Sequence, residues 1–283
     1  MLEKEKITAL VEDIKKKKEL QGIDDDFVAQ YLVKYVNQEP KLLKSLQENF
    51  NPKSKAYDLV IKTVRSKLRR VYGLFRDDAK ERKSAVETLL KAPSAKRAAL
   101  LEKILSTHSS TQERLPIYER LYSKIFAIAG KPKIILDLGC GINPFSFFHM
   151  KLKECIYYAY DINEEEINSI NTFFQLLHKE NPSFTGKAMV ADILAVPLPK
   201  ADLCFLFKMT DVLDQGKGHK KTEELLKKIP AKYVVVSFAT KTMSGKAMTA
   251  PRRSWMEWLC KRLGYDFEIL EFENELFYVV KKR

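Results

Sequence analysis

The segment Lys133-Ile134-Ile135-Leu136-Asp137-Leu138-Gly139-Cys140-Gly141-Ile142-Asn143-Pro144 decides the fold of this 283-residue chain. Its apolar, partly β-branched start predicts a buried parallel strand. An acidic residue and two glycines one residue apart follow, which predicts a tight turn from this strand into a helix. Glycine at such a turn lets the backbone approach a ligand closely, because no Cβ stands in the way. A nicotinamide dinucleotide fingerprint would need a third glycine where Pro144 stands, so the sequence disfavours that class of site.

Two more acidic residues follow at the ends of the next two predicted strands. Residues 155–160 end in Asp161, twenty residues past Gly141, where a carboxylate can accept hydrogen bonds from both hydroxyls of a ribose. A third segment ends in Ala191-Asp192-Ile193. Asp161 and Asp192 could each be an ordinary helix N-cap. Three acids in this order, with Asp-x-Gly-x-Gly, nevertheless resemble the cofactor site of S-adenosylmethionine-dependent methyltransferases, a pattern that assigns the adenine contacts to Asp192 and Ile193.

Composition and length indicate a soluble globular protein, large enough for two domains. Hydrophobic residues make up 45% of the chain and charged residues 31%, and no run approaches the ~18 apolar residues that span a bilayer. The N-terminus is charged and lacks the apolar core of a signal peptide. The four cysteines form no Cys-x-x-Cys pair and the four histidines lie far apart. We therefore expect reduced thiols, a cytoplasmic location and no metal site.

The net charge of +13 is concentrated in one part of the chain. Residues 1–59 are balanced, whereas residues 60–105 carry 13 basic and 5 acidic side chains, a local charge of +8. Such an excess predicts a polyanionic partner, with RNA preferred over an anionic membrane surface. A solvated lysine-rich surface is the alternative.

Residues 1–105 are predicted to be helical throughout, and the helix over residues 54–75 has two distinct faces. Its apolar side chains fall within one arc that can pack into a helical bundle. A stripe of cations lies beside this arc, formed by Lys62, Arg65, Arg69 and Arg76. The stripe predicts contacts with RNA phosphates, the alternative being an idle solvated face.

The run 108–116 precedes another amphipathic helix, which closes at Gly130. We expect Ser110 or Thr111 to cap this helix, which puts Arg114 in its first turn. The helix dipole disfavours a cation at that position. We therefore predict that Arg114 holds an anion, such as the methionine carboxylate of the cofactor.

The rest of the chain completes an alternating α/β pattern. The remaining predicted strands, of which the last two form a terminal hairpin, lie at residues 201–208, 233–238, 267–272 and 276–280. An amphipathic helix is predicted over residues 210–229, and the polar, basic loop 239–246 lies at the ligand edge of the sheet. We predict a Rossmann-like α/β domain with a seven-stranded sheet at residues 106–283, behind an all-helical RNA-docking domain at residues 1–105.

From about Ser54 onward the chain resembles the aminoglycoside-resistance 16S ribosomal RNA guanine-N7 methyltransferases and their relatives among RNA N7-methylguanine enzymes. The matching blocks are residues 65–75, 108–116, 136–144, 191–193, 201–208 with Gln215, and 235–238 with Thr240 and Lys241. With the resemblance included, the predicted S-adenosylmethionine-binding residues are Phe75, His108, Ser109, Ser110, Arg114, Asp137, Gly139, Gly141, Asp161, Asp192, Ile193, Leu206 and Gln215. The predicted RNA-binding residues are Lys62, Arg65, Arg69, Arg76, Lys241 and Lys246.

Three departures from the family pattern leave the substrate open. Gln112 stands where the family usually has arginine, Ala239 where it usually has proline, and residues 246–253 do not follow its glycine-rich pattern. Small-subunit ribosomal RNA is the preferred substrate, and transfer RNA is the alternative. A catalytically silent RNA-binding module on the same fold and a small-molecule methyltransferase are the rivals from other classes. The small-molecule enzyme would leave the basic segment unexplained.

The predicted target atom is guanine N7. Methylation of an adenine amine typically uses an Asn/Asp-Pro-Pro-aromatic motif after the fourth strand, where this chain has Lys208-Met209-Thr210-Asp211. The chain also lacks the Pro-Cys loop of enzymes that attack pyrimidine C5. Guanine N7 carries an unprotonated lone pair on the major-groove edge, so it needs no general base. We predict catalysis by orientation, with no catalytic side chain, in a monomer without membrane contact.

Overall fold

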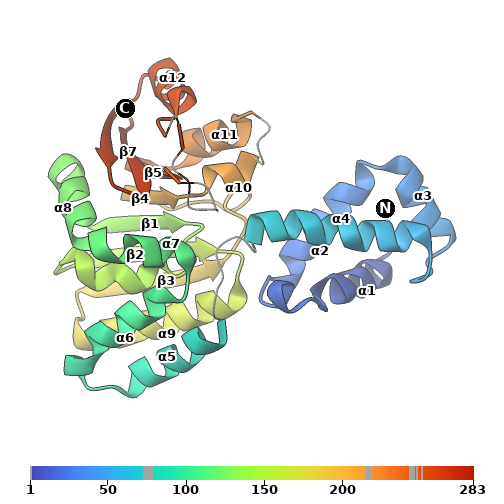
Figure 1. Ribbon diagram of the computed structural model, residues 1–283, viewed down its shortest axis with the longest axis horizontal. Helices are drawn as coiled ribbons and strands as arrows, with labels where there is room; N and C mark the ends of the chain where they lie inside the picture. Colours follow the sequence, from blue (N-terminus) through green and yellow to red (C-terminus); the bar gives the residue numbers. More distant parts are fainter. Residues whose placement is uncertain (1, 73–78, 215–217, 242–245, 247, 250) are drawn as a thin grey trace. The chain divides into compact units, whose positions relative to one another are not determined.

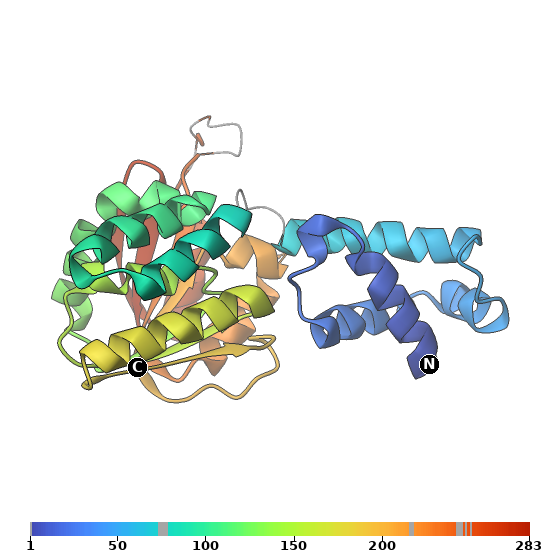
Figure 2. The ribbon, with the colours of Figure 1, turned by 90° about the horizontal axis from the view of Figure 1, so that it is seen from below.

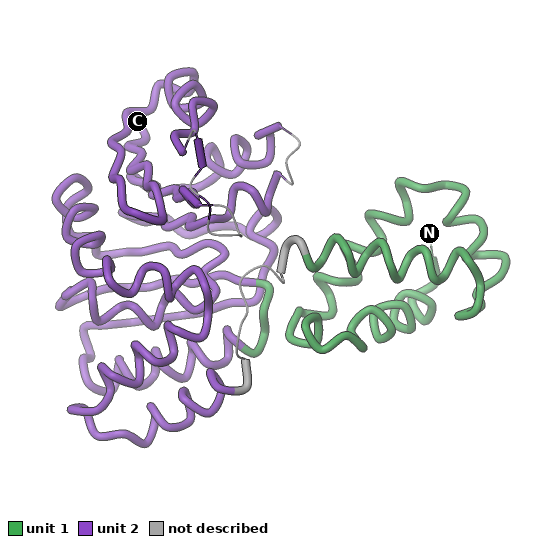
Figure 3. The backbone as a smooth tube through the Cα atoms, in the orientation of Figure 1, with its two compact units in different colours: residues 1–75, 162–165 green, residues 76–161, 166–283 purple. Residues whose placement is uncertain are grey.

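The computed structural model describes residues 2–72, 79–214, 218–241, 246, 248–249 and 251–283. It divides into two compact units, one comprising residues 1–75 and 162–165, and the other residues 76–161 and 166–283 (Figure 3). The domain boundary expected at residue 105 therefore lies inside the second unit. The predictions made for Phe75, Arg76 and Gln215 fall outside the described residues.

The first unit is helical in its described residues, in agreement with the prediction. Its helices are α1 (Lys4–Lys15), η1 (Lys18–Leu20), α2 (Asp25–Asn37), α3 (Pro40–Glu48) and α4 (Lys55–Tyr72). α2 begins where the Asp24 side chain accepts a hydrogen bond from Phe27 N at 2.8 Å, and α3 begins at Pro40, whose fixed φ suits the first helical position. Val60 and Leu68 are fully buried, so the apolar arc of α4 faces the helical core.

The second unit is built on a seven-stranded mixed sheet with the strand order β3-β2-β1-β4-β5-β7-β6 (Figure 1). The strands are β1 (Ile134–Leu138), β2 (Cys155–Asp161), β3 (Phe184–Val190), β4 (Ala201–Phe207), β5 (Ala231–Ala239), β6 (Asp266–Glu271) and β7 (Glu275–Lys281). The first five are parallel, and β7 is antiparallel to both of its neighbours. The predicted Rossmann-like sheet with a terminal hairpin is confirmed.

Helices cover both faces of this sheet, and each face has its own apolar layer (Figures 1 and 2). One layer includes α5 (Ala79–Lys91), α6 (Ser94–Ser106), α8 (Tyr118–Ala129), η4 (Asn143–Met150) and α9 (Glu164–Glu180), and the other includes α10 (Thr210–Asp214), α11 (Lys220–Lys228) and α12 (Ser254–Leu263). The segment between α6 and α8 forms α7 (Ser109–Arg114) and η3 (Leu115–Ile117). Leu89 of α5 and Leu105 of α6 share a layer with Tyr157 of β2, which explains why α5 and α6 belong to the second unit.

The single helix predicted over residues 210–229 is two helices in the structure, α10 and α11. Gly218 between them has a φ of +66°, a left-handed conformation that an α-helix does not contain. Asp214 accepts hydrogen bonds from Lys221 N at 3.1 Å and Thr222 N at 3.4 Å. It thereby satisfies N–H groups that have no partner inside α11.

The antiparallel direction of β7 brings an acidic residue to the ligand edge of the sheet. Glu275 is the first residue of β7 and pairs with Ala239, the last residue of β5. It therefore lies where the parallel strands have their carboxyl ends. Sheets of this topology bind their ligands at that edge.

Candidate functional site

The turn after β1 carries the two glycines that the sequence assigns to the cofactor. Gly139 and Gly141 have φ values of +66° and +47°, which residues with a side chain rarely adopt. Gly139 N and Cys140 N donate to Tyr160 O at 2.8 and 3.0 Å, and Gly141 N donates to Asp161 Oδ2 at 2.8 Å. The turn is thereby fixed against the carboxyl end of β2.

Two other segments lie directly against these glycines. A Cβ added to Gly139 would lie 2.2 Å from Met209 Sδ, and one added to Gly141 would lie 3.6 Å from His108 Nε2. The structure thus brings the end of β4 and the start of α7 to the same turn. These three segments are far apart in the sequence.

Asp161 and Asp192 lie at neighbouring strand ends, as predicted. Ala191 N donates to Asp161 O at 2.9 Å, which joins the residues after β3 to the end of β2. Asp192 Oδ1 accepts a hydrogen bond from Leu194 N at 2.9 Å, so this oxygen closes a local turn. Ile193 is buried, with 5% exposure. No helix of the described residues begins at Asp192, so the helix N-cap that the sequence left open for it is not formed.

Asp137 lies beneath the glycine turn. Its side chain is 1% exposed, and Oδ2 accepts hydrogen bonds from Asn143 Nδ2 at 2.9 Å and Tyr157 OH at 2.7 Å. Burial raises the pKa of Asp137 to about 6, although the two hydrogen bonds act to lower it. Asp137 therefore supports the turn through Asn143, and its predicted cofactor contact stays a prediction.

α7 begins and ends differently from the sequence prediction. Its N-cap is His108, and Ser110 Oγ lies 3.0 Å from His108 Nδ1 while Thr111 Oγ1 donates to His108 O at 3.0 Å. Arg114 lies in the last turn of α7, where the helix dipole favours a cation. The dipole argument for an external anion at Arg114 is therefore wrong.

Arg114 does hold an anion, and that anion is Glu275 of β7. Arg114 Nε and Nη2 donate to the two carboxylate oxygens at 2.9 and 3.0 Å, and the two side chains are 2% and 1% exposed. The guanidinium also stacks on the Phe207 ring, 4.6 Å from its centroid. Burial acts to lower the pKa of Arg114, but the charge of Glu275, its hydrogen bonds and the contacts with Tyr118 together raise it. The guanidinium is thus paired with Glu275 within the protein, and its predicted contact with the cofactor stays a prediction.

Sequence reasoning missed Glu275 and a second cation beside it. Lys208 Nζ lies 3.6 Å from Glu275 Oε2 and also pairs with Glu113, and Ser237 Oγ donates to Glu275 Oε1. Lys208 has a φ of +54°, a left-handed conformation that costs a non-glycine residue about 1–2 kcal/mol. A single acid directly before the apolar run of β7 is the sequence signal that could have identified this network.

The remaining predicted residues are Leu206 and Ser109 for the cofactor and Lys241 and Lys246 for RNA. Leu206 is fully buried in the layer that contains α10, α11 and α12, and Ser109 is half-buried at the start of α7. Lys241 Nζ lies 2.9 Å from Glu273 Oε1, and Lys246 is exposed.

In the first unit, Lys62 and Arg69 are exposed cations of α4, as predicted. Lys62 Nζ lies 2.7 Å from Asp58 Oδ2, and Arg69 Nε donates to Glu19 Oε1 at 2.8 Å. Exposed ion pairs of this kind contribute little to stability. Both cations can therefore exchange their carboxylate partners for phosphates at small cost.

Arg65 has a structural role, which corrects the prediction that it faces outward with the stripe. Its Nε donates to Ile14 O at 3.2 Å and its Nη2 donates to Asp13 O. These carbonyls belong to the last turn of α1, where helix carbonyls lack the usual i+4 partner, and Asp13 O also accepts from the C-cap residue Lys16 N at 3.3 Å. Arg65 thus caps α1.

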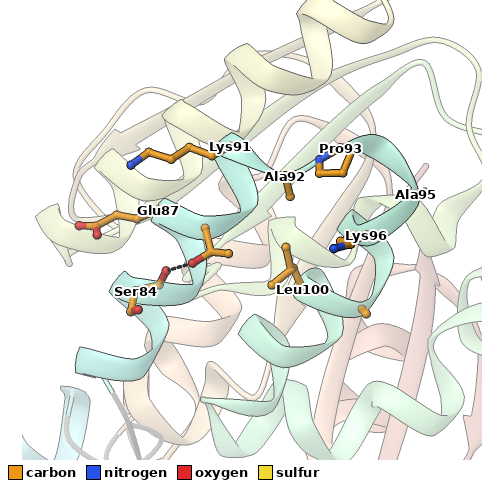
Figure 4. Close-up of a pocket in the computed structure, with 10 residues that line it drawn as sticks. Ser84, Glu87, Lys91, Ala92, Pro93, Ala95, Lys96 and Leu100 are labelled. Carbon is orange, nitrogen blue, oxygen red and sulfur yellow. Dashed lines mark hydrogen bonds between the residues drawn. The ribbon is translucent and has the colours of Figure 1, made fainter.

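A groove of about 730 Å³ lies between α5 and α6 (Figure 4). Its lining includes Ser84, Lys91, Pro93 and Leu100, and none of the predicted cofactor residues. The groove is therefore separate from the glycine turn. Among the residues that the structure describes, no cluster of histidine, cysteine or acidic side chains could hold a metal ion, and no helix could cross a bilayer.

The topology of the sheet and the glycine turn held against Asp161 define the class of S-adenosylmethionine-dependent methyltransferases. The family model described as ribosomal RNA methyltransferase (FmrO) matches residues 33–279. The chain belongs to this FmrO family of ribosomal RNA methyltransferases.

Individual relatives and a solved structure agree with this membership. The chain is 29% identical to the 16S rRNA (guanine(1405)-N(7))-methyltransferase of Proteus mirabilis, over 78% of this chain and 83% of the relative. It is 31% identical to the enzyme of that name from Serratia marcescens, over 69% of this chain and 76% of the relative. The crystal structure of the 16S rRNA methyltransferase RmtF with S-adenosyl-L-homocysteine shares the fold, with a TM-score of 0.74, 23% identity and full coverage of both chains.

Proposed function

We propose that this protein transfers a methyl group from S-adenosylmethionine to N7 of a guanine in 16S ribosomal RNA, within the small ribosomal subunit. The observation that carries the proposal is an intact glycine turn, held by Asp161, in a chain that matches an RNA methyltransferase family over residues 33–279. The relatives from Proteus mirabilis and Serratia marcescens are named for this reaction. The proposed enzyme is a cytoplasmic monomer.

The residues around the turn fit the cofactor. Gly139 and Gly141 present backbone without a Cβ, and the Asp161 carboxylate at the end of β2 would accept the ribose hydroxyls. Asp192 and Ile193 would contact the adenine. When bound, S-adenosylmethionine supplies a methyl group that is activated by the positive charge on its sulfur.

The chemistry of the surrounding residues favours N7 as the target atom. Cys204 is fully buried, and burial raises the pKa of its thiol well above the ordinary value, so it does not supply a thiolate nucleophile. The end of β4 carries Lys208 where an adenine-amine enzyme has an amide or acid. Guanine N7 needs neither a nucleophile nor a general base. The task of this site is then to orient N7 in line with the methyl–sulfur bond.

The first unit supplies the RNA-docking surface in this proposal. Lys62 and Arg69 are exposed on α4, and Arg76 continues the same stripe in the sequence. Lysine and arginine side chains bind phosphates without reading bases, so they would position the enzyme on a structured RNA. Substrate choice would then depend on the shape of the small subunit.

The decisive experiment compares purified small subunits, free 16S RNA and transfer RNA as acceptors of the labelled methyl group. We expect transfer to intact small subunits. Reduction with borohydride followed by aniline should then cleave the methylated RNA at the modified guanine, because these reagents cut at N7-methylguanine. The Asp161→Ala variant should lose transfer and serves as the matched control for contaminating activity.

Each of the other outcomes favours one of the alternative functions. Labelled transfer RNA with unlabelled subunits would change the substrate, and methylated RNA that resists cleavage would change the target atom. If the protein binds small subunits but no substrate becomes labelled, it is a silent RNA-binding module.

A further inference from the structure

We propose that Glu275 is the positioning residue of the methyl-transfer site, a buried carboxylate that holds in place the two segments lying on the cofactor glycines. This inference rests on the proposed function. It assigns a role to the start of β7, a part of the chain outside the glycine turn and its acids.

Glu275 is joined to three different parts of the sheet edge. Arg114, at the end of α7, donates to both of its carboxylate oxygens at 2.9 and 3.0 Å. Lys208, after β4, places Nζ 3.6 Å from Oε2, and Ser237 in β5 donates to Oε1. The Glu275 side chain is 1% exposed, so water does not substitute for these partners.

The two cations connect Glu275 to the two glycines. Lys208 precedes Met209, whose Sδ lies 2.2 Å from where a Cβ on Gly139 would be. Arg114 ends the helix that His108 caps, and His108 Nε2 would lie 3.6 Å from a Cβ on Gly141. Moving either cation therefore moves a side chain that lines the cofactor turn.

The strained backbone at Lys208 supports a positioning role. Its φ of +54° costs free energy unless other contacts hold it there. Lys208 N donates to Ser237 O at 3.2 Å and to Ser237 Oγ at 3.0 Å, while Nζ lies between Glu275 and Glu113. The carboxylate thus fixes both ends of this residue, through Ser237 on one side and through the ammonium on the other.

A buried carboxylate with two buried cations is not required for stability alone. Buried ion pairs often contribute less to folding than apolar residues of the same volume, because taking the charges out of water is costly. Removing only the carboxylate would leave the buried Arg114 guanidinium without its ion pair and Lys208 with Glu113 as its remaining partner. Both side chains would then be expected to move away from their present positions.

The test uses Glu275→Asp, which keeps the charge but withdraws the carboxylate by one methylene, and Glu275→Gln, which removes the charge. Glu268→Gln, an exposed acid on the neighbouring strand β6, is the matched control. We measure single-turnover methyl transfer at saturating small subunits, the affinity for those subunits, and the affinity for S-adenosyl-L-homocysteine by calorimetry. Circular dichroism establishes that each variant is folded.

For Glu275→Asp we expect a transfer rate about 100-fold lower, the size of loss that a displacement of about 1 Å produces. Cofactor affinity should fall roughly tenfold, the equivalent of one lost hydrogen bond, and the affinity for small subunits should not change. If Glu275→Gln does not fold, Glu275→Asp carries the test alone, because the buried charges stay balanced. A folded Glu275→Asp with wild-type transfer and cofactor affinity overturns the inference.

Failure of the proposed function gives a different result. If the wild-type protein methylates no RNA, the function is wrong, but the calorimetric comparison of Glu275→Asp with Glu268→Gln still decides whether Glu275 positions the cofactor turn.

Discussion

Replacing Asp137 with asparagine should stabilise the protein at neutral pH. The pKa of this carboxyl is about 6 in the folded protein against an ordinary value of 3.8, because burial disfavours its charged form. The difference of about two pH units corresponds to about 3 kcal/mol at a pH above both values. Asparagine has nearly the same shape and can still accept the hydrogen bonds from Asn143 and Tyr157.

The sign of the pH dependence follows from proton binding. The folded protein binds the Asp137 proton more tightly than the unfolded chain does. The contribution of Asp137 to stability is therefore most favourable below pH 3.8 and is lost as the pH rises through 6. The free-energy cost of burying the ionised carboxylate reaches its full size once the pH is well above 6. The advantage of Asp137→Asn should therefore be about 3 kcal/mol at pH 8 and about half of that at pH 5.

Urea denaturation of both proteins at pH 5 and pH 8, followed by circular dichroism, measures this difference. Asp266→Asn at the exposed start of β6 is the control, for which we expect no comparable gain. A gain for Asp137→Asn that is the same at both pH values, or a loss at pH 8, would refute the argument that burial dominates this carboxyl.

Four further variants test the two proposed binding surfaces and the structural role of Arg65. Asp161→Ala should weaken S-adenosyl-L-homocysteine binding by about 1–3 kcal/mol in calorimetry, since the ribose loses a charged acceptor, and unchanged affinity would remove Asp161 from the site. Gly139→Ala should cost about 1–2 kcal/mol of stability from its left-handed backbone, seen as a lower melting temperature, and should also impair cofactor binding. Converting Lys62 and Arg69 to glutamine should reduce the salt dependence of small-subunit binding, and an unaltered salt dependence would mean that these two cations do not contact RNA. Arg65→Gln should instead lower the free energy of unfolding by about 1 kcal/mol.

The parts of the fold that the sequence predicted well depend on local patterns. The spacing of Gly139 and Gly141 after an apolar run was sufficient to predict the turn, and the strand that ends in Asp161 followed from its own apolar residues. The apolar arc of α4 was visible because helix periodicity places Val60 and Leu68 on one face. Each of these features involves residues that are close together in the chain.

The features that the sequence did not reveal depend on distant partners. Arg114 is 161 residues from Glu275, and only the antiparallel return of β7 brings them together. Arg65 was misplaced because its acceptors are backbone carbonyls at the end of α1, which have no signature in the amino-acid sequence. The hydrogen bonds that Asp137 accepts from Asn143 and Tyr157 were not predicted, because no sequence pattern shows that these side chains meet.

The place of β7 in the sheet also affects the order in which this protein can fold during its synthesis. β7 leaves the ribosome after every other strand of the sheet, yet it lies between β5 and β6. Until it inserts, Arg114 lacks the carboxylate that balances it and Lys208 has only Glu113, so a nascent chain cannot bury the guanidinium without a large electrostatic cost. Assembly of the ligand edge should therefore be a late, all-or-none event, and a chain stalled before Glu275 should expose that edge to proteases and chaperones.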